Sequence, residues 1–233
     1  MVTLTATSAA NSSFTGWTGC DSVLDGKCTI KMTSGRAVTA EFFDDGDGVP
    51  PGVEDGGPNG GDGNDDGTSD SLQGDVTTLK TADGLNYATV SNTNGAGQTN
   101  VQAVDPPADA PSGIVFPYGM FEFTVTGIEE GGTVHMEVYV PYDPVITGYW
   151  KKNVNTGQWE DIAQSVTKVG NQMRITFNLT DGGDYDEDVV SGQITDQGGP
   201  DTVKAVPTMT ESCRSYGGIL HEEKGLQRIV QGL

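Results

Sequence analysis

Oxygen-bearing side chains are concentrated in one short stretch of the chain, residues 44–74. Its 31 residues, DDGDGVPPGVEDGGPNGGDGNDDGTSDSLQG, contain eight Asp, one Glu and ten Gly, with no Lys, Arg or aromatic residue. Nine carboxylates packed so densely repel one another unless a cation lies between them. The stretch is therefore either a solvated, flexible linker or a segment that wraps around metal ions. The spacing of its side chains favours metal.

Residues 62–73 have the spacing of a calcium-binding loop. The pattern D-x-[DN]-x-[DN]-G presents oxygen ligands at alternate positions, and the glycine at position 6 allows a sharp turn. Position 7 would offer its backbone carbonyl, whereas the bidentate Glu that an EF-hand carries at position 12 is missing, so the loop is not a complete EF-hand. The predicted ligands are Asp62, Asn64, Asp66, Thr68, Asp70 and Gln73.

A second, poorer copy of the pattern precedes this loop, with Asp45, Asp47 and Glu54 as its predicted ligands. In the same register its positions 1 and 9 are Phe43 and Pro51, which have no side-chain oxygen, although Asp44 could substitute at the first. Calcium is the predicted ion in both loops. Magnesium is a weaker candidate because it dehydrates reluctantly and rarely uses a cage made only of protein ligands.

The units DGDGVPxxxE and DGNxDGxxDxxQ resemble thrombospondin type 3 calcium repeats. That resemblance implies a spacer in a bacterial surface protein, in which calcium stiffens a chain that has almost no apolar core of its own.

Composition limits the classes of partner. The 233 residues carry a net charge of -21, which argues against DNA, RNA or anionic lipid as a partner because phosphate recognition needs Lys and Arg. No run of 18 apolar residues is present, so we expect no membrane insertion. The N-terminal residues lack the features of a signal peptide, which alone would indicate the cytoplasm. The other features favour an extracellular or surface location and an incomplete N-terminus.

Cys20 and Cys28 flank a short loop whose Asp25-Gly26 predicts a tight turn. A disulfide between them is geometrically plausible and would indicate an oxidising compartment. The alternative is two reduced, buried thiols, and Cys213 is left over.

Residues 1–43 alternate apolar and polar side chains in three short runs, around residues 2–6, 28–32 and 38–42, which predicts three strands. We expect Phe14 and Trp17, between the first two, to cap a small core. The pattern VTLTATSAANSSFTGWTGC…CTIKMTSGRAVTAEF resembles the second half of the divergent internalin-type B repeat of bacterial surface proteins. That resemblance implies a truncated β module, because the family has further strands upstream.

Residues 75–200 also alternate with period two, and Gly-, Pro- and Asn-rich breaks separate the runs. This predicts an antiparallel β-sandwich, including a hairpin from Tyr149 to Trp159 with a turn at Gly157. Two stretches of this region resemble the choice-of-anchor U domain of bacterial extracellular proteins, namely PSGIVFPYGMFEFTVTGIEEGGTVHMEVYVP and DGGDYDEDVVSGQITDQGGP. No catalytic motif defines the role of that family.

Residues 201–233 form a tail. Val206 to Glu211 resembles the opening of an IPTL-type sorting signal, but the apolar helix and basic end that should follow are absent. A shifted reading frame or a divergent tail would each explain this. We expect a short helix at residues 219–230.

The chain is not predicted to be an enzyme, because it has no nucleophile motif, HExxH or P-loop. A third acidic cluster, Asp181 to Asp188, is either a calcium site or a solvated turn. The aromatic residues Tyr142, Tyr149, Trp150 and Trp159 could form a platform for sugar stacking.

The sequence thus predicts a non-enzymatic, all-β, secreted or surface-displayed modular protein. A truncated β module (1–43), a calcium-binding linker (44–74), a β-sandwich (75–200) and a tail (201–233) follow one another, and calcium stiffens the stalk or display modules. The alternative is a carbohydrate-binding adhesin module that recognises a glycan through exposed Trp and Tyr side chains of the sandwich. Besides calcium, the expected partner is a glycan or another surface protein.

Overall fold

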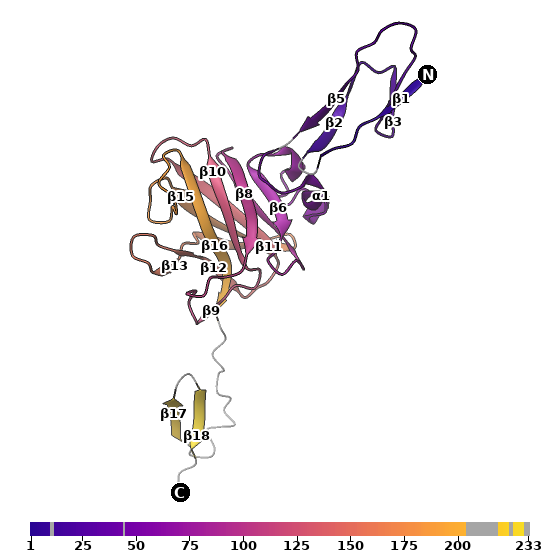
Figure 1. The fold of residues 1–233 in the computed structure, drawn as a ribbon. Helices are drawn as coiled ribbons and strands as arrows, with labels where there is room; N and C mark the ends of the chain where they lie inside the picture. The colour runs from indigo at the N-terminus through magenta and orange to yellow at the C-terminus, as the bar shows by residue number, and fades with distance from the viewer. Residues whose placement is uncertain (10–11, 44, 204–218, 224–225, 231–233) are drawn as a thin grey trace. The chain divides into compact units, whose positions relative to one another are not determined.

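The computed structural model describes residues 1–9, 12–43, 45–203, 219–223 and 226–230. The regular structure in these residues is β, apart from one turn of α-helix and two turns of 3-10 helix. The predicted all-β class is therefore confirmed (Figure 1). Residues 1–203 and 204–233 form two separate units.

The N-terminal residues form two small sheets from five strands, not from the three that alternation predicts. The two additional strands have weak sequence signals: one is only three residues long, and the other contains a glycine and a register shift. One sheet has the order β1-β4-β3, and β2 pairs with β5 in the other. The strands are β1 (Val2–Thr5), β2 (Ser13–Thr18), β3 (Ser22–Leu24), β4 (Lys27–Ile30) and β5 (Thr39–Phe43).

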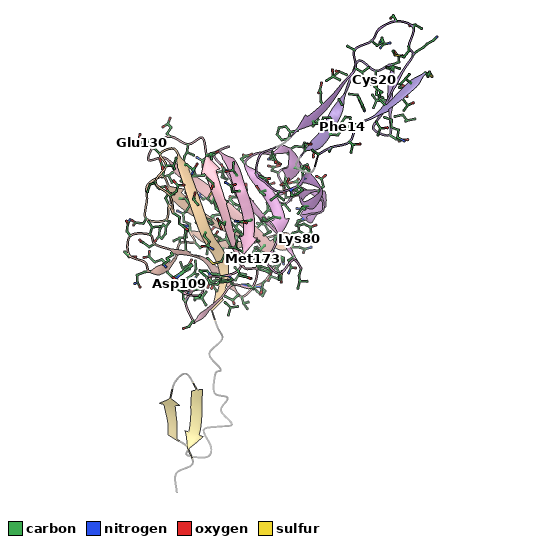
Figure 2. All side chains as sticks on the ribbon, viewed as in Figure 1. Phe14, Cys20, Lys80, Asp109, Glu130 and Met173 are labelled. Atoms are coloured by element: carbon green, nitrogen blue, oxygen red, sulfur yellow. A yellow bond between two sulfur atoms is a disulfide. The ribbon has the colours of Figure 1, made fainter. Side chains whose placement is uncertain are left out.

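A disulfide joins Cys20 to Cys28, as predicted, with their Cα atoms 5.6 Å apart. Asp25 and Gly26 both have positive φ, 49° and 69°, which is the backbone that a tight hairpin turn between β3 and β4 requires. Phe14, which Figure 2 labels together with Cys20, packs edge-on against Trp17 with ring centroids 5.6 Å apart. The aromatic pair and the disulfide therefore stabilise a module that has few buried side chains.

Two antiparallel sheets form the sandwich. One has the order β13-β12-β16-β10-β8, with β9 also pairing with β16, and the other has the order β14-β15-β11-β7-β6. The predicted hairpin is present, because β12 pairs with β13 across Gly157. The strands are β6 (Val76–Lys80), β7 (Tyr87–Asn92), β8 (Gly97–Val104), β9 (Ile114–Val115), β10 (Met120–Thr126), β11 (Thr133–Pro141), β12 (Ile146–Lys152), β13 (Trp159–Asp161), β14 (Ser165–Val169), β15 (Gln172–Thr180) and β16 (Gln193–Val203).

The core lies between the two sheets. Alternate residues of each strand point inward, so that Phe121 and Phe123 of β10 and Val138 of β11 are fully buried. Tyr149 of β12 stacks on Phe177 of β15 with ring centroids 4.1 Å apart. Burial of each such side chain contributes about 2 kcal/mol, which makes this interface the main stabilising contact of the domain.

Residues 45–74, called the acidic segment below, pack along one edge of the sandwich. At this edge, β6 is the outermost strand of one sheet and β8 is the outermost strand of the other. The backbone N–H of Val101 on β8 donates to the carbonyl of Asp47, and that of Gln98 donates to the carbonyl of Gly74. Val49 joins the hydrophobic core, and α1 lies beside β6 (Figure 1). The segment contains α1 (Pro51–Glu54) and the 3-10 turns η1 (Pro58–Gly60) and η2 (Asp70–Leu72). Residues 45–74 are therefore packed against the sandwich and do not form a free-standing linker.

The C-terminal unit contains a two-stranded hairpin, β17 (Ile219–Glu223) and β18 (Leu226–Val230). The predicted helix at residues 219–230 is wrong. A helix of this length is marginal in water without tertiary contacts. The residues that resemble a sorting signal, 206–211, lie outside the described residues. Within the described residues, no helix has both the length and the apolar character needed to cross a membrane.

The disulfide should account for a large part of the stability of the N-terminal module. Replacing both Cys20 and Cys28 by Ser removes a short covalent loop, which should lower the free energy of unfolding of this module by roughly 2–3 kcal/mol. Hydrogen–deuterium exchange of the full chain should show faster exchange in β3 and β4 and unchanged exchange in β10 and β11. Dithiothreitol should accelerate exchange in the wild-type module but not in the double variant; equal exchange in all samples would contradict the prediction.

Candidate metal centre

Three carboxylates of the acidic segment converge beside β6. Asp45 and Asp47 lie on the loop before α1, and Glu54 is the last residue of α1. The ligand atoms that these three residues offer all lie within 4.8 Å of one another, and no other such group of Asp, Glu, His or Cys occurs in the described residues. The consecutive prolines Pro50 and Pro51 begin the helical turn, because their fixed φ suits its first residues. That turn brings Glu54 back towards the two Asp residues.

Asp47 and Glu54 each have one carboxylate oxygen held by the backbone and one without a partner. Asp47 Oδ1 accepts the N–H of Val49 at 2.7 Å, and Glu54 Oε1 accepts the N–H of Thr78 on β6 at 3.2 Å. Asp47 Oδ2 and Glu54 Oε2 are buried and receive no hydrogen bond. Both residues are 0% exposed. A buried oxygen without a donor costs free energy, so each of these oxygens requires a proton or a cation.

The electrostatics of the site agree with this requirement. Burial, together with the charges of Asp47 and Asp45, raises the pKa of Glu54 to about 10. Burial also raises the pKa of Asp47. Without a cation, therefore, Glu54 holds a proton at neutral pH. A divalent cation would replace that proton and remove the repulsion among the three carboxylates.

The three residues could hold a metal ion. Oxygen atoms that share a calcium ion lie about 2.3–2.6 Å from it. Two ligands on opposite sides of the ion are thus about 4.6–5.2 Å apart. The ligand atoms of Asp45, Asp47 and Glu54 lie within 4.8 Å of one another, which is compatible with that spacing. Three carboxylates are also the hard oxygen ligands that calcium prefers.

The predicted loop at residues 62–73 satisfies most of its own carboxylate oxygens. Asp62 accepts the N–H groups of Asp66 and Gly67, both at 2.9 Å. The side-chain amides of Asn64 and Gln73 both donate to Asp66 Oδ2, at 3.1 Å and 2.9 Å. Thr68 donates its backbone N–H to Asp66 Oδ1. In this arrangement the two amide groups occupy positions around Asp66 that a cation would otherwise take.

Asp70, position 9 of that loop, turns into the sandwich edge. Its Oδ2 accepts the N–H of Gly63 at 2.9 Å and the hydroxyl of Thr78 at 2.5 Å, whereas its Oδ1 is buried without a partner. Burial raises its pKa to about 6. A Cβ on Gly63 would lie 2.0 Å from Thr89 Oγ1, so only glycine allows the loop to approach the sheet this closely. Thr78 of β6 therefore contacts Glu54 in the first part of the acidic segment and Asp70 in the second. No local sequence signal predicts this role of Thr78.

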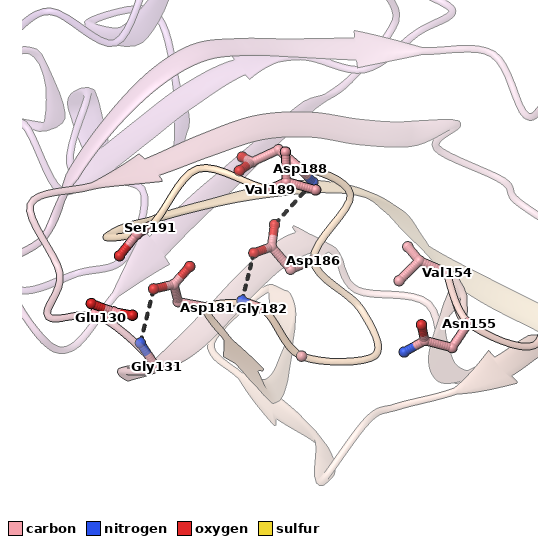
Figure 3. Close-up of a pocket in the computed structure, with 11 residues that line it drawn as sticks. Glu130, Gly131, Val154, Asn155, Asp181, Gly182, Asp186, Asp188, Val189 and Ser191 are labelled. Carbon is pink, nitrogen blue, oxygen red and sulfur yellow. Dashed lines mark hydrogen bonds between the residues drawn. The ribbon is translucent and has the colours of Figure 1, made fainter.

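The third acidic cluster serves as a structural element of a turn. Asp181 Oδ2 accepts the N–H groups of Gly131 and Gly192, both at 2.9 Å, and Asp186 Oδ2 accepts that of Gly182. Figure 3 shows the first and third of these bonds across a surface hollow. Asp188 accepts the hydroxyl of Thr195. Because backbone amides and a hydroxyl satisfy these carboxylates, the geometry favours the turn over a second metal centre.

The proposed aromatic platform is partly wrong. Tyr149 is fully buried in the core, because it lies on the inner face of β12. Trp159 is partly exposed and packs near Phe116, with ring centroids 6.4 Å apart. Tyr142 is 45% exposed, and Lys168 Nζ lies 4.1 Å from its ring centroid. Tyr149 therefore cannot stack on a sugar, whereas Trp150, Trp159 and Tyr142 retain accessible surface.

Comparison with known proteins gives one match. The family model of the divergent InlB B-repeat domain matches residues 1–46. The resemblance of the N-terminal module to a partial B repeat is thus supported, and it indicates a surface-associated, modular protein. No curated protein and no solved structure matches the chain.

The protonated state of Glu54 predicts a pH dependence of the cation-free protein. The folded-state pKa of about 10 lies above the usual value of 4.5, so the folded state binds this proton more tightly than the unfolded state. The resulting stability is complete below the usual value and is lost as the pH rises towards 10. In EDTA, the melting temperature should fall between about pH 5 and pH 9, and it should fall less in Glu54→Gln, which keeps the shape without the charge. Glu41→Gln, at an exposed position of β5, should behave as the wild type. Parallel curves for Glu54→Gln and wild type would contradict the assignment.

Proposed function

We propose that residues 45–73 bind calcium, and that the bound ion fixes this segment on the edge of the β-sandwich in a non-enzymatic, surface-displayed modular protein. The observation that supports this most directly is that the buried oxygens Asp47 Oδ2 and Glu54 Oε2 receive no hydrogen bond, in two residues of a group of three carboxylates that could hold a metal ion. The match of the preceding residues to a B-repeat domain supports the surface location.

The proposed mechanism couples ion binding to the ordering of the segment. Without an ion, Glu54 holds a proton and no cation links the three carboxyl groups, so the segment is bound to the sandwich less firmly. Binding of calcium replaces that proton, links the three carboxylates and favours the packed state, by about 2.7 kcal/mol at a free calcium concentration one hundred times the Kd. The core contact of Val49 and the hydrogen bond between Asp47 and Val101 are then stabilised together with the site.

The position of the site in the chain connects it to the N-terminal module. Strand β5 ends at Phe43, and the first proposed ligand is Asp45. Because the ligand lies so close to the end of the module, an ion held by Asp45 and Asp47 would restrict the rotation of the chain between the module and the sandwich. Calcium would thereby stiffen the connection between the two, as a stalk or display function requires.

Calcium titration of the EDTA-stripped full chain tests the proposal directly. We expect saturable heat of binding together with a rise in melting temperature. Glu54→Gln and Asp47→Asn should abolish binding of at least one ion. Asp65→Asn is a matched control, because Asp65 is an exposed carboxylate of the same segment with a positive φ of 62° that Asn also tolerates. No binding at roughly 10⁻³ M calcium, the weak end for extracellular modules, would overturn the proposal.

The loop at residues 62–73 requires a separate test. If it also binds an ion, the amides of Asn64 and Gln73 must rotate so that their oxygens replace the N–H groups that now contact Asp66. Asp62→Ala with Asp66→Ala should then lower the stoichiometry by one ion and abolish calcium-dependent protection of the segment from proteolysis. Unchanged stoichiometry and cleavage in this double variant would assign all binding to Asp45, Asp47 and Glu54.

A further inference from the structure

The sandwich interior contains a buried cation that the proposed calcium site does not involve. Among the described residues, Lys151 is the one Lys or Arg that is fully buried. Its Nζ lies 2.6 Å from Glu187 Oε1 and 2.8 Å from Asp196 Oδ1. The side chains of Lys151 and Asp196 are both 0% exposed, whereas that of Glu187 is 32% exposed. One amine is therefore enclosed with two carboxylates, only one of which reaches solvent.

The strand register holds Lys151 and Asp196 side by side. Strands β12 and β16 are antiparallel neighbours in which Lys151 pairs with Gly198. Asp196 lies two residues along β16, so its side chain is on the same face as that of Lys151, at a diagonal cross-strand position. This is the inner face, because Tyr149 of β12 and Ile194 of β16 belong to the core. Gly198 provides the space: a Cβ there would lie 2.4 Å from the ring of Tyr149.

The contact between the amine and Asp196 is close but is not aligned as a hydrogen bond. Asp196 Oδ2 accepts the hydroxyl of Tyr149 at 3.1 Å. Its Oδ1 receives no hydrogen bond, although Lys151 Nζ is only 2.8 Å away. The amine thus approaches the carboxyl group of Asp196 while its hydrogen bond goes to Glu187.

The surroundings of Asp196 oppose its charged form. Burial raises the pKa of Asp196, Lys151 opposes the shift, and the charge of Glu187 adds to it. Burial also raises the pKa of Tyr149, so its hydroxyl remains a donor. In an interior of low dielectric constant, transfer of a proton from the ammonium to the carboxylate removes two buried charges. The products of this transfer are an amine and a carboxylic acid in contact, which are the reactants of amide formation.

We propose that Lys151 Nζ and Asp196 Cγ form an intramolecular amide bond that covalently joins β12 to β16, with Glu187 transferring protons. The Nζ lone pair forms the bond to Cγ, and the bond from Cγ to Oδ1 breaks with its electron pair on oxygen. The ammonium loses two protons, and Oδ1 gains two and leaves as water. Glu187 accepts a proton from Nζ and passes it on, so it is unchanged at the end. The reaction therefore requires no oxidant, reductant or other reactant.

Tyr149 has a positioning and stabilising role in this step. Its hydroxyl holds Asp196 Oδ2, the oxygen that carries negative charge in the tetrahedral intermediate and becomes the amide oxygen. A fixed donor at that oxygen stabilises the charge as it develops. Stacking on Phe177 and full burial fix the ring.

Two effects promote formation of the amide. Groups that a protein holds in contact react with effective concentrations that reach about 10⁵–10⁸ M, which lowers the barrier to condensation. The amide also removes the charges of Lys151 and Asp196 from the interior. The released water has a route outward, because Glu187 lines a surface hollow together with Trp159 and Gln197.

Such a bond would close a covalent loop that contains β13, β14 and β15. Force applied to the ends of the chain would then pass from β12 directly to β16, and those three strands could not be extended. This property suits a display module, but the proposed bond does not depend on calcium, and its test is independent of the calcium titration.

Intact-mass spectrometry of the full chain, denatured and with its disulfide reduced, tests the proposal. We expect the wild-type mass to be lower than the sequence mass by one water. A tryptic digest should give a linked pair of peptides that contain Lys151 and Asp196, and cleavage after Lys151 should be absent. Glu187→Gln, which changes a partly exposed residue, should keep the fold, shown by an unchanged circular dichroism spectrum, and lose most of the cross-link.

A matched control is the neighbouring ion pair Lys152–Asp109, whose atoms are 2.5 Å apart but whose side chains are 44% and 55% exposed. Lys152→Met should retain the loss of water, and Lys151→Met should abolish it. A wild-type mass equal to the sequence mass would overturn the proposal and leave an ion pair. Loss of water that persists in Lys151→Met, or that maps to an Asp-Gly sequence as a succinimide, would overturn it as well.

Discussion

The structure depends on how the chain neutralises buried carboxylates when cations are scarce. The sequence has 33 Asp and Glu residues but only 12 Lys and Arg, so most acidic side chains cannot have an ion-pair partner. An uncompensated carboxylate in the interior costs several kcal/mol. Each one that the fold buries therefore needs a backbone amide, a hydroxyl, a proton or an external cation. Asp181 uses backbone amides. Asp70, Asp47 and Glu54 each have one oxygen held by an amide or a hydroxyl and one buried oxygen without a donor.

This requirement connects the acidic segment to the architecture of the sandwich. A sandwich of two open sheets leaves unpaired strand edges, and exposed edges favour association with other chains. Here β6 and β8 end their sheets on the same side, and the acidic segment hydrogen bonds to both. A segment so rich in Asp and Gly has little apolar surface to hold it there, apart from Val49 and Val53. Polar contacts therefore hold the acidic segment on the sandwich. Under the proposed function, the charge balance at Glu54 would determine how firmly the segment binds.

Local patterns in the sequence predict the sandwich well, because alternation reports directly which face of a strand is buried. The tight turn at Asp25-Gly26 and the disulfide follow from local spacing in the same way. Strand β2 and the orientation of Tyr149 depend on contacts with distant strands, which no local window contains. Judged by spacing alone, the loop at residues 62–73 is the better calcium site, because this loop resembles an EF-hand more closely than does the group around Asp47. In the structure, however, the carboxylates around Asp47 lie closer together. The turn after Pro50 brings Glu54 back to the two Asp residues, and the backbone of β6 holds Glu54 there.

The two unusual clusters differ in their distance from solvent, and this difference decides which chemistry is available to each. The carboxylates of Asp45, Asp47 and Glu54 lie in a segment at the edge of the sandwich, where an ion from the medium would be able to enter and leave, so the proposed neutralisation there would be reversible and would respond to calcium. Asp196 lies between the sheets, where the cation that contacts it, among the residues that the structure describes, is a lysine of the adjacent strand. That lysine cannot leave without unfolding the domain, and its charge remains buried as long as it stays ionised. The proposed condensation would remove both charges permanently, because the register of β12 and β16 keeps the amine against the carboxyl group. The excess of Asp and Glu over Lys and Arg would thus lead to a reversible, calcium-dependent contact at the edge of the sandwich and to a permanent covalent bond in its core.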